Sequence, residues 1–211
     1  TLDGKNYIEE YVHALTHELK SPLAAIKAAQ EILQDKKLSD ADRERFTQSV
    51  ATQVDRMQTL IDKLLLLAKV EQRRNLENVE QVDLVVLIHS LSDSLVARLR
   101  SRNLQLKLNL DESLQVRGDL FLLKLAFNNL LENAINHADA NSELVVATHV
   151  NDEMIAIQFE NRGEPIPDYA LPRLGERIYA LVRHDGQRGS GLGLRIVNEV
   201  ARLHGGQFLI S

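Results

Sequence analysis

Apolar residues recur at alternating steps of four and three along the first third of the chain. They form one seam over residues 8–33 and a second over residues 46–67. A seam with this period predicts two long helices that pack along one face. The polar stretch QDKKLSD separates them, and either Ser39 or Asp40 is suited to cap the second helix. A two-helix hairpin is too thin to bury both apolar faces, so we expect two copies to form a four-helix bundle through residues 1–70.

The pattern becomes mixed after residue 74, where we place a domain boundary. Helical periodicity predicts helices at 82–102, 118–138 and 195–206. Alternation predicts strands at 103–110, 142–150 and 153–161, with a last strand beginning at 207. The elements follow one another without a regular βαβ repeat. The expected fold class is therefore α+β multidomain, with a helical hairpin followed by a layered domain at 75–211.

Composition narrows the possible functions. The chain has 211 residues, of which 44% are hydrophobic and 26% are charged, as is ordinary for a globular protein. Its net charge of -5 argues against a nucleic-acid partner, which requires a concentrated basic surface. The absence of cysteine excludes disulfides, thiolate metal sites and thiol catalysis. Apolar runs such as 64–68 are far too short to span a membrane.

The stretch HELKSP places reactive groups on the first helix. His17 lies between two seam positions, so its side chain is expected to point away from the hairpin core. Glu18 could accept a hydrogen bond from one ring nitrogen and leave the other nucleophilic. Ser21 follows at i+4 and shares the face of His17. Pro22 removes a backbone hydrogen bond, which predicts a bend beside His17.

Each of these features also has an ordinary interpretation. An exposed histidine on a helix is usually a surface residue, and a proline in a helix is often only a kink. His13 and His17 have the i, i+4 spacing of a metal-binding pair, but no third ligand is apparent and the zinc-protease order is absent.

A second candidate site is the stretch NNLLENAINHA. Asn129, Asn133 and Asn136 lie at i, i+4 and i+7, which places them on one stripe of an otherwise apolar helix. The stripe could be a solvated polar face. Carboxamide oxygens also suit Mg²⁺, and amide nitrogens can donate to phosphate oxygens.

Glycines mark two further candidate segments. Gly189, Gly191 and Gly193 run directly into a helix, where bare backbone N–H groups can bind an anion. Alone, this spacing is more often a flexible loop, and it fits neither a dinucleotide fingerprint nor a Walker A loop. In ENRGEPIP, Asn161 and Gly163 could simply be turn residues after a strand.

Taken together and in this order, the motifs resemble the cytoplasmic core of a bacterial sensor histidine kinase. HELKSPL looks like the H box, NLLENA the N box, NRGEPI the G1 box and GSGLGL the G2 box, while ERIYAL stands where an F box would be. The resemblance covers nearly the whole chain. It implies a dimerisation and histidine-phosphotransfer hairpin at 1–74. An ATP-binding α/β sandwich of GHKL (Bergerat) type would follow at 75–211, and we expect it to continue past Ser211.

The resemblance also implies a mechanism. His17 would attack the γ-phosphate of ATP, with Glu18 orienting it, and Asn133 would be a Mg²⁺ ligand. Residues 179–189 would form the ATP lid. The phosphoryl group would pass to an aspartate of a response regulator, and Ser21 stands where the family positions water for dephosphorylating that regulator. The implied nucleotide-binding residues are Asn129, Asn133, Asn136, His137, Asn161, Gly163, Gly189, Gly191 and Gly193.

Three positions depart from the family pattern. Asn161 replaces an aspartate, Pro165 replaces the second G1 glycine, and Asn136 replaces a common lysine. Loss of a charged acceptor and of a positive charge weakens hydrogen bonds to the nucleotide. We therefore predict weaker ATP binding than is typical of the family.

Two alternatives to a working kinase remain open. These departures would suit a phosphatase-dominant protein or a degenerate kinase that acts as a dimeric scaffold. A GHKL-type ATPase is the other rival, although it has no need of the HELKSP hairpin. The family resemblance further implies a homodimer in the cytoplasm, joined to the bacterial inner membrane only through segments outside this chain.

Overall fold

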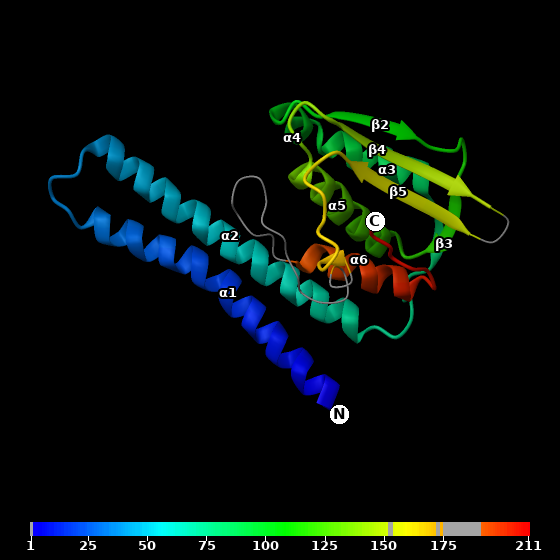
Figure 1. The fold of residues 1–211 in the computed structure, drawn as a ribbon, viewed down its shortest axis with the longest axis horizontal. Coiled ribbons are helices and arrows are strands. Elements are labelled where there is room, and N and C mark those ends of the chain that lie inside the picture. Colours follow the sequence, from blue (N-terminus) through cyan, green and yellow to red (C-terminus); the bar gives the residue numbers. More distant parts are fainter. Residues whose placement is uncertain (1, 152–153, 172–173, 175–190) are drawn as a thin grey trace. The chain divides into compact units, whose positions relative to one another are not determined.

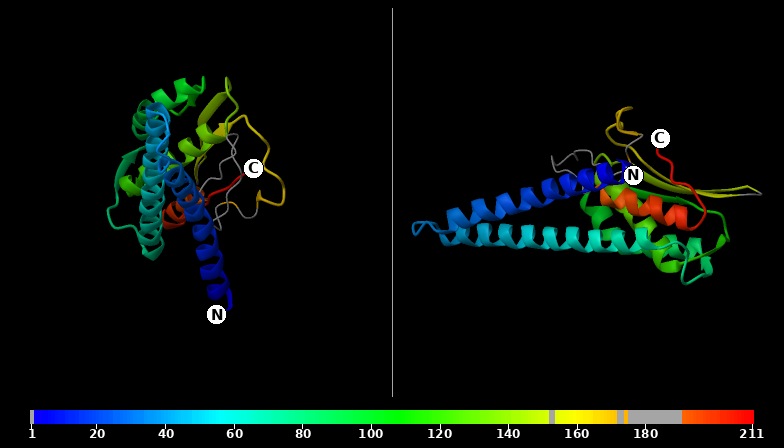
Figure 2. Two further views of the ribbon diagram at one scale, coloured as in Figure 1. Left: turned by 90° about the vertical axis from the view of Figure 1, so that its left-hand side faces the viewer. Right: turned by 90° about the horizontal axis from the view of Figure 1, so that it is seen from below.

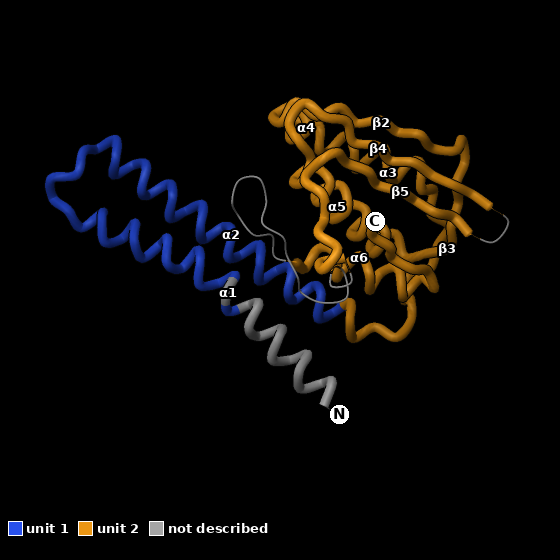
Figure 3. The backbone as a smooth tube through the Cα atoms, in the orientation of Figure 1, with its two compact units in different colours: residues 1–69 blue, residues 70–211 orange. Residues whose placement is uncertain are grey.

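The computed structural model describes residues 2–151, 154–171, 174 and 191–211. The chain forms two compact units, residues 1–69 and residues 70–211 (Figure 3). The domain boundary predicted after residue 74 stays a prediction, and each unit is described by itself below.

The first unit is the predicted helical hairpin (Figure 1). It consists of α1 (Leu2–Leu33) and most of α2 (Asp40–Gln72), and α1 continues through Pro22 without interruption. Seam residues are the buried ones in the described part of the hairpin, with Leu67 fully buried and Leu60 nearly so. The predicted seam is thereby confirmed from residue 19 onward, where the burial of its side chains is described. The Ser39 hydroxyl accepts a hydrogen bond from the Asp42 backbone N–H at 3.1 Å, which makes Ser39 the cap of α2.

A second row of apolar side chains on the hairpin is exposed in the single chain. Leu23, Val54, Ile61 and Leu65 lie outside the seam, and Leu65 is 58% exposed. Leu23 belongs to α1 and the other three to α2. Several exposed apolar side chains on one hairpin favour an interaction surface over an ordinary solvated face.

The second unit has two layers. One layer is a three-stranded sheet of order β2-β4-β5, in which β2 is parallel and β5 antiparallel to β4. Helices α3, α5 and α6 lie on one side of this sheet (Figure 2). A separate antiparallel pair joins β1 and β3. The elements of this unit are β1 (Glu80–Asp83), α3 (Leu84–Ser94), α4 (Val96–Ser101), β2 (Gln105–Asn109), β3 (Gln115–Gly118), α5 (Leu120–His137), β4 (Glu143–Val150), β5 (Ile155–Asn161) and α6 (Leu192–Leu203).

The core of this unit lies between the sheet and the helices. Alternate residues of β4, Leu144 and Val146, are fully buried, as the two-residue period of a strand requires. The rings of Phe127 on α5 and Phe159 on β5 lie 5.9 Å apart and join the two layers. The apolar face of α5 is therefore fixed against the sheet, and its polar stripe is oriented with it.

Most predicted elements are confirmed, but two predictions are wrong and one strand was missed. The helix predicted at 82–102 begins as strand β1, because the Asp83 carboxylate accepts from Val86 N–H at 3.0 Å and so starts α3 at Leu84. The helix is also broken at Leu95, between α3 and α4. Strand β3 was not predicted. The strand predicted from Gln207 is absent: residues 207–211 are not in a strand and pair with none of the described strands. Of the helices described, none has both the length and the apolar composition of a membrane span.

Candidate functional site

The predicted polar stripe lies on α5, which begins and ends where the sequence indicated. The Asp119 carboxylate caps the helix by accepting from Leu122 N–H at 3.2 Å, and it is buried beside Arg73 with a contact of 3.3 Å. Within the stripe, Asn129 is buried, whereas Asn133 and Asn136 are half-buried. Two of the three carboxamides are therefore accessible to a ligand.

The N-terminal end of the stripe contacts the start of α6. The Asn129 side-chain amide donates to the Leu125 carbonyl at 2.8 Å, so the amide group is held on its own helix. The Asn129 side-chain oxygen faces Gly193, where an added Cβ would lie 2.9 Å from it. Gly191 precedes α6 with a φ of 65°, a left-handed conformation that suits glycine. The structure thus brings together the predicted residues Asn129, Gly191 and Gly193, while Gly189 and the predicted lid lie outside the described residues.

The C-terminal end of the stripe contacts the loop after β5. A Cβ added at Gly163 would overlap the carbonyl oxygen of His137, so only glycine allows this approach. The backbone N–H of Asp139 donates to the Arg162 carbonyl at 2.7 Å and holds the same two segments together. Asn161 ends β5 with an exposed side chain. The predicted G1 residues therefore lie beside His137.

Two arginines that the sequence did not single out bind the same end of α5. From α4, Arg98 donates to the Asn136 side-chain oxygen at 3.0 Å, and its guanidinium lies 3.4 Å from the Glu132 carboxylate. The Arg102 guanidinium donates to the backbone carbonyls of Ile135 at 2.8 Å and Asn136 at 3.0 Å, and to that of Ala138 at 2.9 Å. Basic residues in ARLRSR resemble ordinary surface charge, but their i, i+4 spacing on one helical face was a usable signal.

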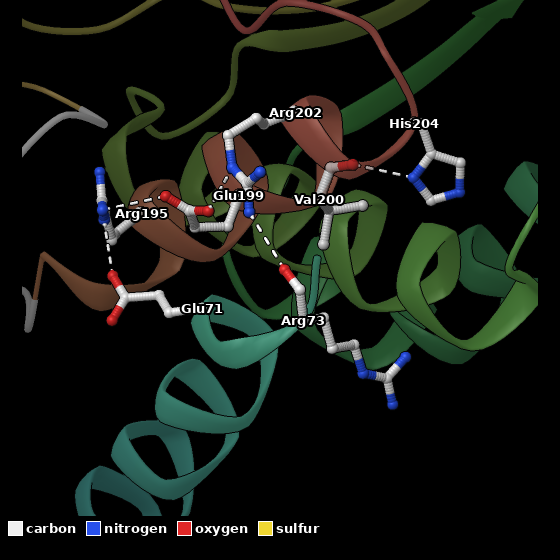
Figure 4. Close-up of polar contacts among 7 residues, drawn as sticks. All are labelled: Glu71, Arg73, Arg195, Glu199, Val200, Arg202 and His204. Atoms are coloured by element: carbon white, nitrogen blue, oxygen red, sulfur yellow. Dashed lines mark hydrogen bonds and ion pairs between the residues drawn. The ribbon is translucent and has the colours of Figure 1, made fainter. Parts of the chain in front are cut away.

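The helix that follows the glycines is anchored by ion pairs (Figure 4). Arg195 on α6 donates to Glu71 at 3.0 Å and to Glu199 at 2.9 Å. Glu199 is buried and also accepts from Arg202 at 2.8 Å. Arg202 in turn reaches the Arg73 carbonyl at 3.4 Å. This network fixes α6 to residues 71–73, so the helix start that carries Gly191 and Gly193 is held in place.

His204 joins the far end of α6 to the start of α5. Its Nδ1 lies 2.8 Å from the Val200 carbonyl, and its Nε2 lies 3.1 Å from the backbone N–H of Asp119. A carbonyl can only accept and an N–H can only donate, so these partners assign the proton to Nδ1. His204 is thus a structural histidine.

The predicted H-box residues lie in the other unit. His17, Glu18 and Ser21 belong to α1, where Ser21 is exposed and Pro22 is buried. The bend predicted at Pro22 stays a prediction.

Comparison with known proteins agrees with both units. Residues 8–73 match the His Kinase A (phospho-acceptor) domain, and residues 118–211 match the histidine kinase-, DNA gyrase B- and HSP90-like ATPase domain. The chain is 42% identical over 206 residues to the sensor protein CreC of Escherichia coli K12, covering 98% of this chain and 43% of CreC. It is 33% identical over 195 residues to QseC of the same organism, covering 90% of this chain and 41% of QseC. It therefore spans less than half of the length of either relative.

Solved structures show the same fold. The Acinetobacter baumannii histidine kinase AdeS matches with a TM-score of 0.69 at 23% identity, covering 89% of this chain and 86% of AdeS. The histidine kinase ThkA, solved in complex with the response regulator protein TrrA, matches with a TM-score of 0.78 at 18% identity, covering 97% of this chain and 57% of ThkA. From its two domain matches and its identity to CreC, the chain belongs to the family of sensor histidine kinases.

Proposed function

We propose that this chain is the kinase core of a sensor protein, that it phosphorylates itself on His17 with ATP, and that it passes the phosphoryl group to an aspartate of a response regulator. A nitrogen of the His17 ring attacks the γ-phosphorus, the bond to the β–γ bridging oxygen breaks, and ADP leaves. Glu18 orients the ring and accepts its proton. One observation carries the proposal: α5 contacts both glycine segments, the one at the start of α6 and the one after β5. Groups that can bind the phosphates and groups that can bind the adenine base therefore lie along one helix.

The two ends of the described site serve different parts of ATP in this proposal. Gly191 and Gly193 lie at the start of α6, where backbone N–H groups and the helix dipole favour a phosphate. Asn161 and Gly163, held beside His137, lie where the adenine would bind. Asn129 is buried and its side chain lies close against Gly193, so its part in the nucleotide site is to shape it.

Asn133 is proposed to hold Mg²⁺. Its carboxamide oxygen is a hard ligand, and Mg²⁺ usually takes only one or two protein ligands and fills the rest of its shell with phosphate oxygens and water. The described residues contain no cluster of three acidic or histidine side chains that would hold a metal without a nucleotide. When bound with ATP, Mg²⁺ neutralises charge on the phosphates.

The partners of the whole protein are proposals as well. The exposed apolar row on α1 and α2 supports a homodimer through residues 1–70 that forms a four-helix bundle. The pairing of ThkA with TrrA supports a response regulator as the phosphoryl acceptor. Because the curated relatives are sensor proteins more than twice as long, we place the full protein in the bacterial inner membrane and this part in the cytoplasm.

The test is incubation with ATP labelled on the γ-phosphate, comparing the chain with its His17→Gln variant. We expect acid-labile, base-stable label on the chain and none on the variant, because phosphohistidine is an acid-labile phosphoramidate. His13→Gln is the matched control, since it removes a histidine one turn away on α1 and should retain the label. No label on a chain that is folded and binds ATP would favour the phosphatase-dominant or scaffold alternative.

A further inference from the structure

Arg98 and Asn136 form a side-chain pair beside the proposed nucleotide site. Arg98 lies on α4 with its side chain 44% exposed, and it donates to the Asn136 side-chain oxygen at 3.0 Å. The other side of its guanidinium lies 3.4 Å from Glu132. Glu132 also accepts from Asn128 at 3.3 Å, so a polar row at i, i+4 and i+8 runs along α5 beside the asparagine stripe.

The chemistry of this pair fixes which way the Asn136 carboxamide points. An arginine side chain has only donors, so it can bind the oxygen of a carboxamide and not its nitrogen. Binding of the oxygen by Arg98 therefore places the –NH₂ group of Asn136 on the side away from the guanidinium. That group carries two N–H donors, which are the groups that a phosphate oxygen accepts from.

The backbone around the pair is held by the second arginine. Arg102 lies one turn after Arg98 and donates to the carbonyls of Ile135, Asn136 and Ala138 at 2.8, 3.0 and 2.9 Å. These carbonyls belong to the last turn of α5 and to its C-cap residue Ala138, where acceptors lack partners within the helix. Consequently α4 and the end of α5 cannot shift past one another, and the Arg98–Asn136 distance is set by the fold.

The charges around the pair explain why an asparagine suits this position. The carboxylate of Glu132 offsets the charge of Arg98. An ammonium group at position 136 would lie beside the guanidinium of Arg98, where like charges repel. The two positions are therefore coupled: Arg98 favours a neutral side chain at 136, and its removal would allow a lysine there.

We propose that Arg98 is a positioning residue of the nucleotide site, which binds the side-chain oxygen of Asn136 and so presents the two amide donors of Asn136 to the phosphates of ATP. This inference rests on the proposed function, because it assumes that ATP binds along α5 with its Mg²⁺ and phosphates beside Asn133, one turn before Asn136 on the same stripe. The adenine then lies beyond them, beside Gly163. It assigns to α4 a part in nucleotide binding that none of the four motifs contains.

The test measures dissociation constants of ATP, ADP and adenosine by calorimetry for the chain and four variants. Arg98→Ala is expected to raise the dissociation constants of ATP and ADP by about tenfold, the factor that corresponds to one charge-assisted hydrogen bond. The dissociation constant of adenosine should not change. Asn136→Asp is nearly isosteric and keeps the contact with Arg98. This variant is expected to weaken ATP binding as much as Arg98→Ala does, because it replaces two donors by a charge that repels phosphate. Its melting temperature should be retained, because the shape of the side chain is kept. Arg100→Ala, on the same helix and exposed, is the matched control.

The fourth variant tests the coupling. In the Arg98→Ala/Asn136→Lys double variant, the ammonium group replaces the lost donors without a neighbouring guanidinium, so ATP binding should return to within about threefold of the unmodified chain. A structural role for Arg98 would not be repaired by a lysine at 136.

The outcomes separate this inference from the proposed function. Unmodified chain that is folded but binds no ATP would overturn both. ATP binding that is normal in the chain and in Arg98→Ala would overturn the inference alone. Equal losses for ATP and adenosine in Arg98→Ala, or normal ATP binding in Asn136→Asp, would also overturn it, because the phosphate-specific effect would be missing.

Discussion

Gly163 is held against a backbone atom, and this sets it apart from two other closely packed glycines. At Gly118 and Gly193 an added Cβ would meet side-chain atoms, of His204 and Leu123 in one case and of Asn129 in the other. Side chains can rotate aside at some cost. The neighbour of Gly163 is the carbonyl oxygen of His137, which cannot move without moving the end of α5.

Replacement of Gly163 by alanine is therefore expected to destabilise the second unit. We predict a loss of about 1–3 kcal/mol in the free energy of unfolding, the usual range for overpacking, together with weaker ATP binding. Urea unfolding followed by circular dichroism measures the first effect. Gly206→Ala is the control, because its nearest neighbour, the Ala201 carbonyl, is 3.6 Å from the added carbon, and we expect a change within about 0.5 kcal/mol. Equal stability of the two variants would contradict the proposed contact.

At the scale of single residues, the sequence indicated the type of residue but not its partner. The motif NRGEPI identified Gly163 as a residue in a turn. Only the fold shows that the carbonyl oxygen of His137 leaves no room for a side chain at this position. Arg98 and Arg102 carried no motif at all. Their partners on α5 are backbone and side-chain oxygens brought near by tertiary packing, which local pattern does not encode.

At the scale of elements, long periodic segments were predictable and short paired ones were not. The helices α1, α2 and α5 have many turns, so their apolar period identifies them. Strands β1 and β3 have four residues each and are stabilised by pairing with one another, from Glu80 with Gly118 to Asp83 with Gln115. Neither contains enough alternation to predict a strand alone. The break between α3 and α4 was missed because the apolar period continues across it.

At the scale of elements, we predict that the ion pairs of α6 stabilise the second unit. Arg195→Ala removes a guanidinium from between Glu71 and the buried Glu199. Among the described residues, Glu199 then keeps Arg202 as its one ion-pair partner. Hydrogen bonds to charged groups contribute about 1.5–3 kcal/mol, so we expect a loss near the lower end of that range in the free energy of unfolding.

The control for Arg195→Ala is Arg45→Ala on α2. The Arg45 side chain is 72% exposed, reaches Asp42 only at 4.0 Å and lies 4.9 Å from the centroid of the Phe46 ring, so its removal should cost about 1 kcal/mol or less. Thermal and urea unfolding of both variants measure the difference. A cost for Arg195→Ala no larger than that of Arg45→Ala would show that the network adds nothing to the stability of α6.

At the scale of the whole molecule, the exposed apolar row of the hairpin predicts the assembly. Leu65 lies outside the seam and is 58% exposed, so Leu65→Glu should leave the hairpin intact and place a charge in the contact between copies. We expect sedimentation velocity to show a dimer for the chain and a monomer for this variant. Gln48→Glu, at an exposed polar position of α2, should remain dimeric. An unmodified chain that sediments as a monomer would overturn the homodimer proposal.

The parallel pairing of β2 with β4 has a consequence for how the molecule forms during synthesis. The middle strand of the sheet is β4, and β2, which pairs with it from Gln105 with Glu143 onward, precedes it by the whole length of β3 and α5. Such non-local pairing forms slowly, and on a ribosome it waits until β4 has emerged. The contacts of the helical hairpin are complete once residue 72 has been made. The hairpin that carries His17 can therefore form its own contacts while the second unit still lacks the centre of its sheet.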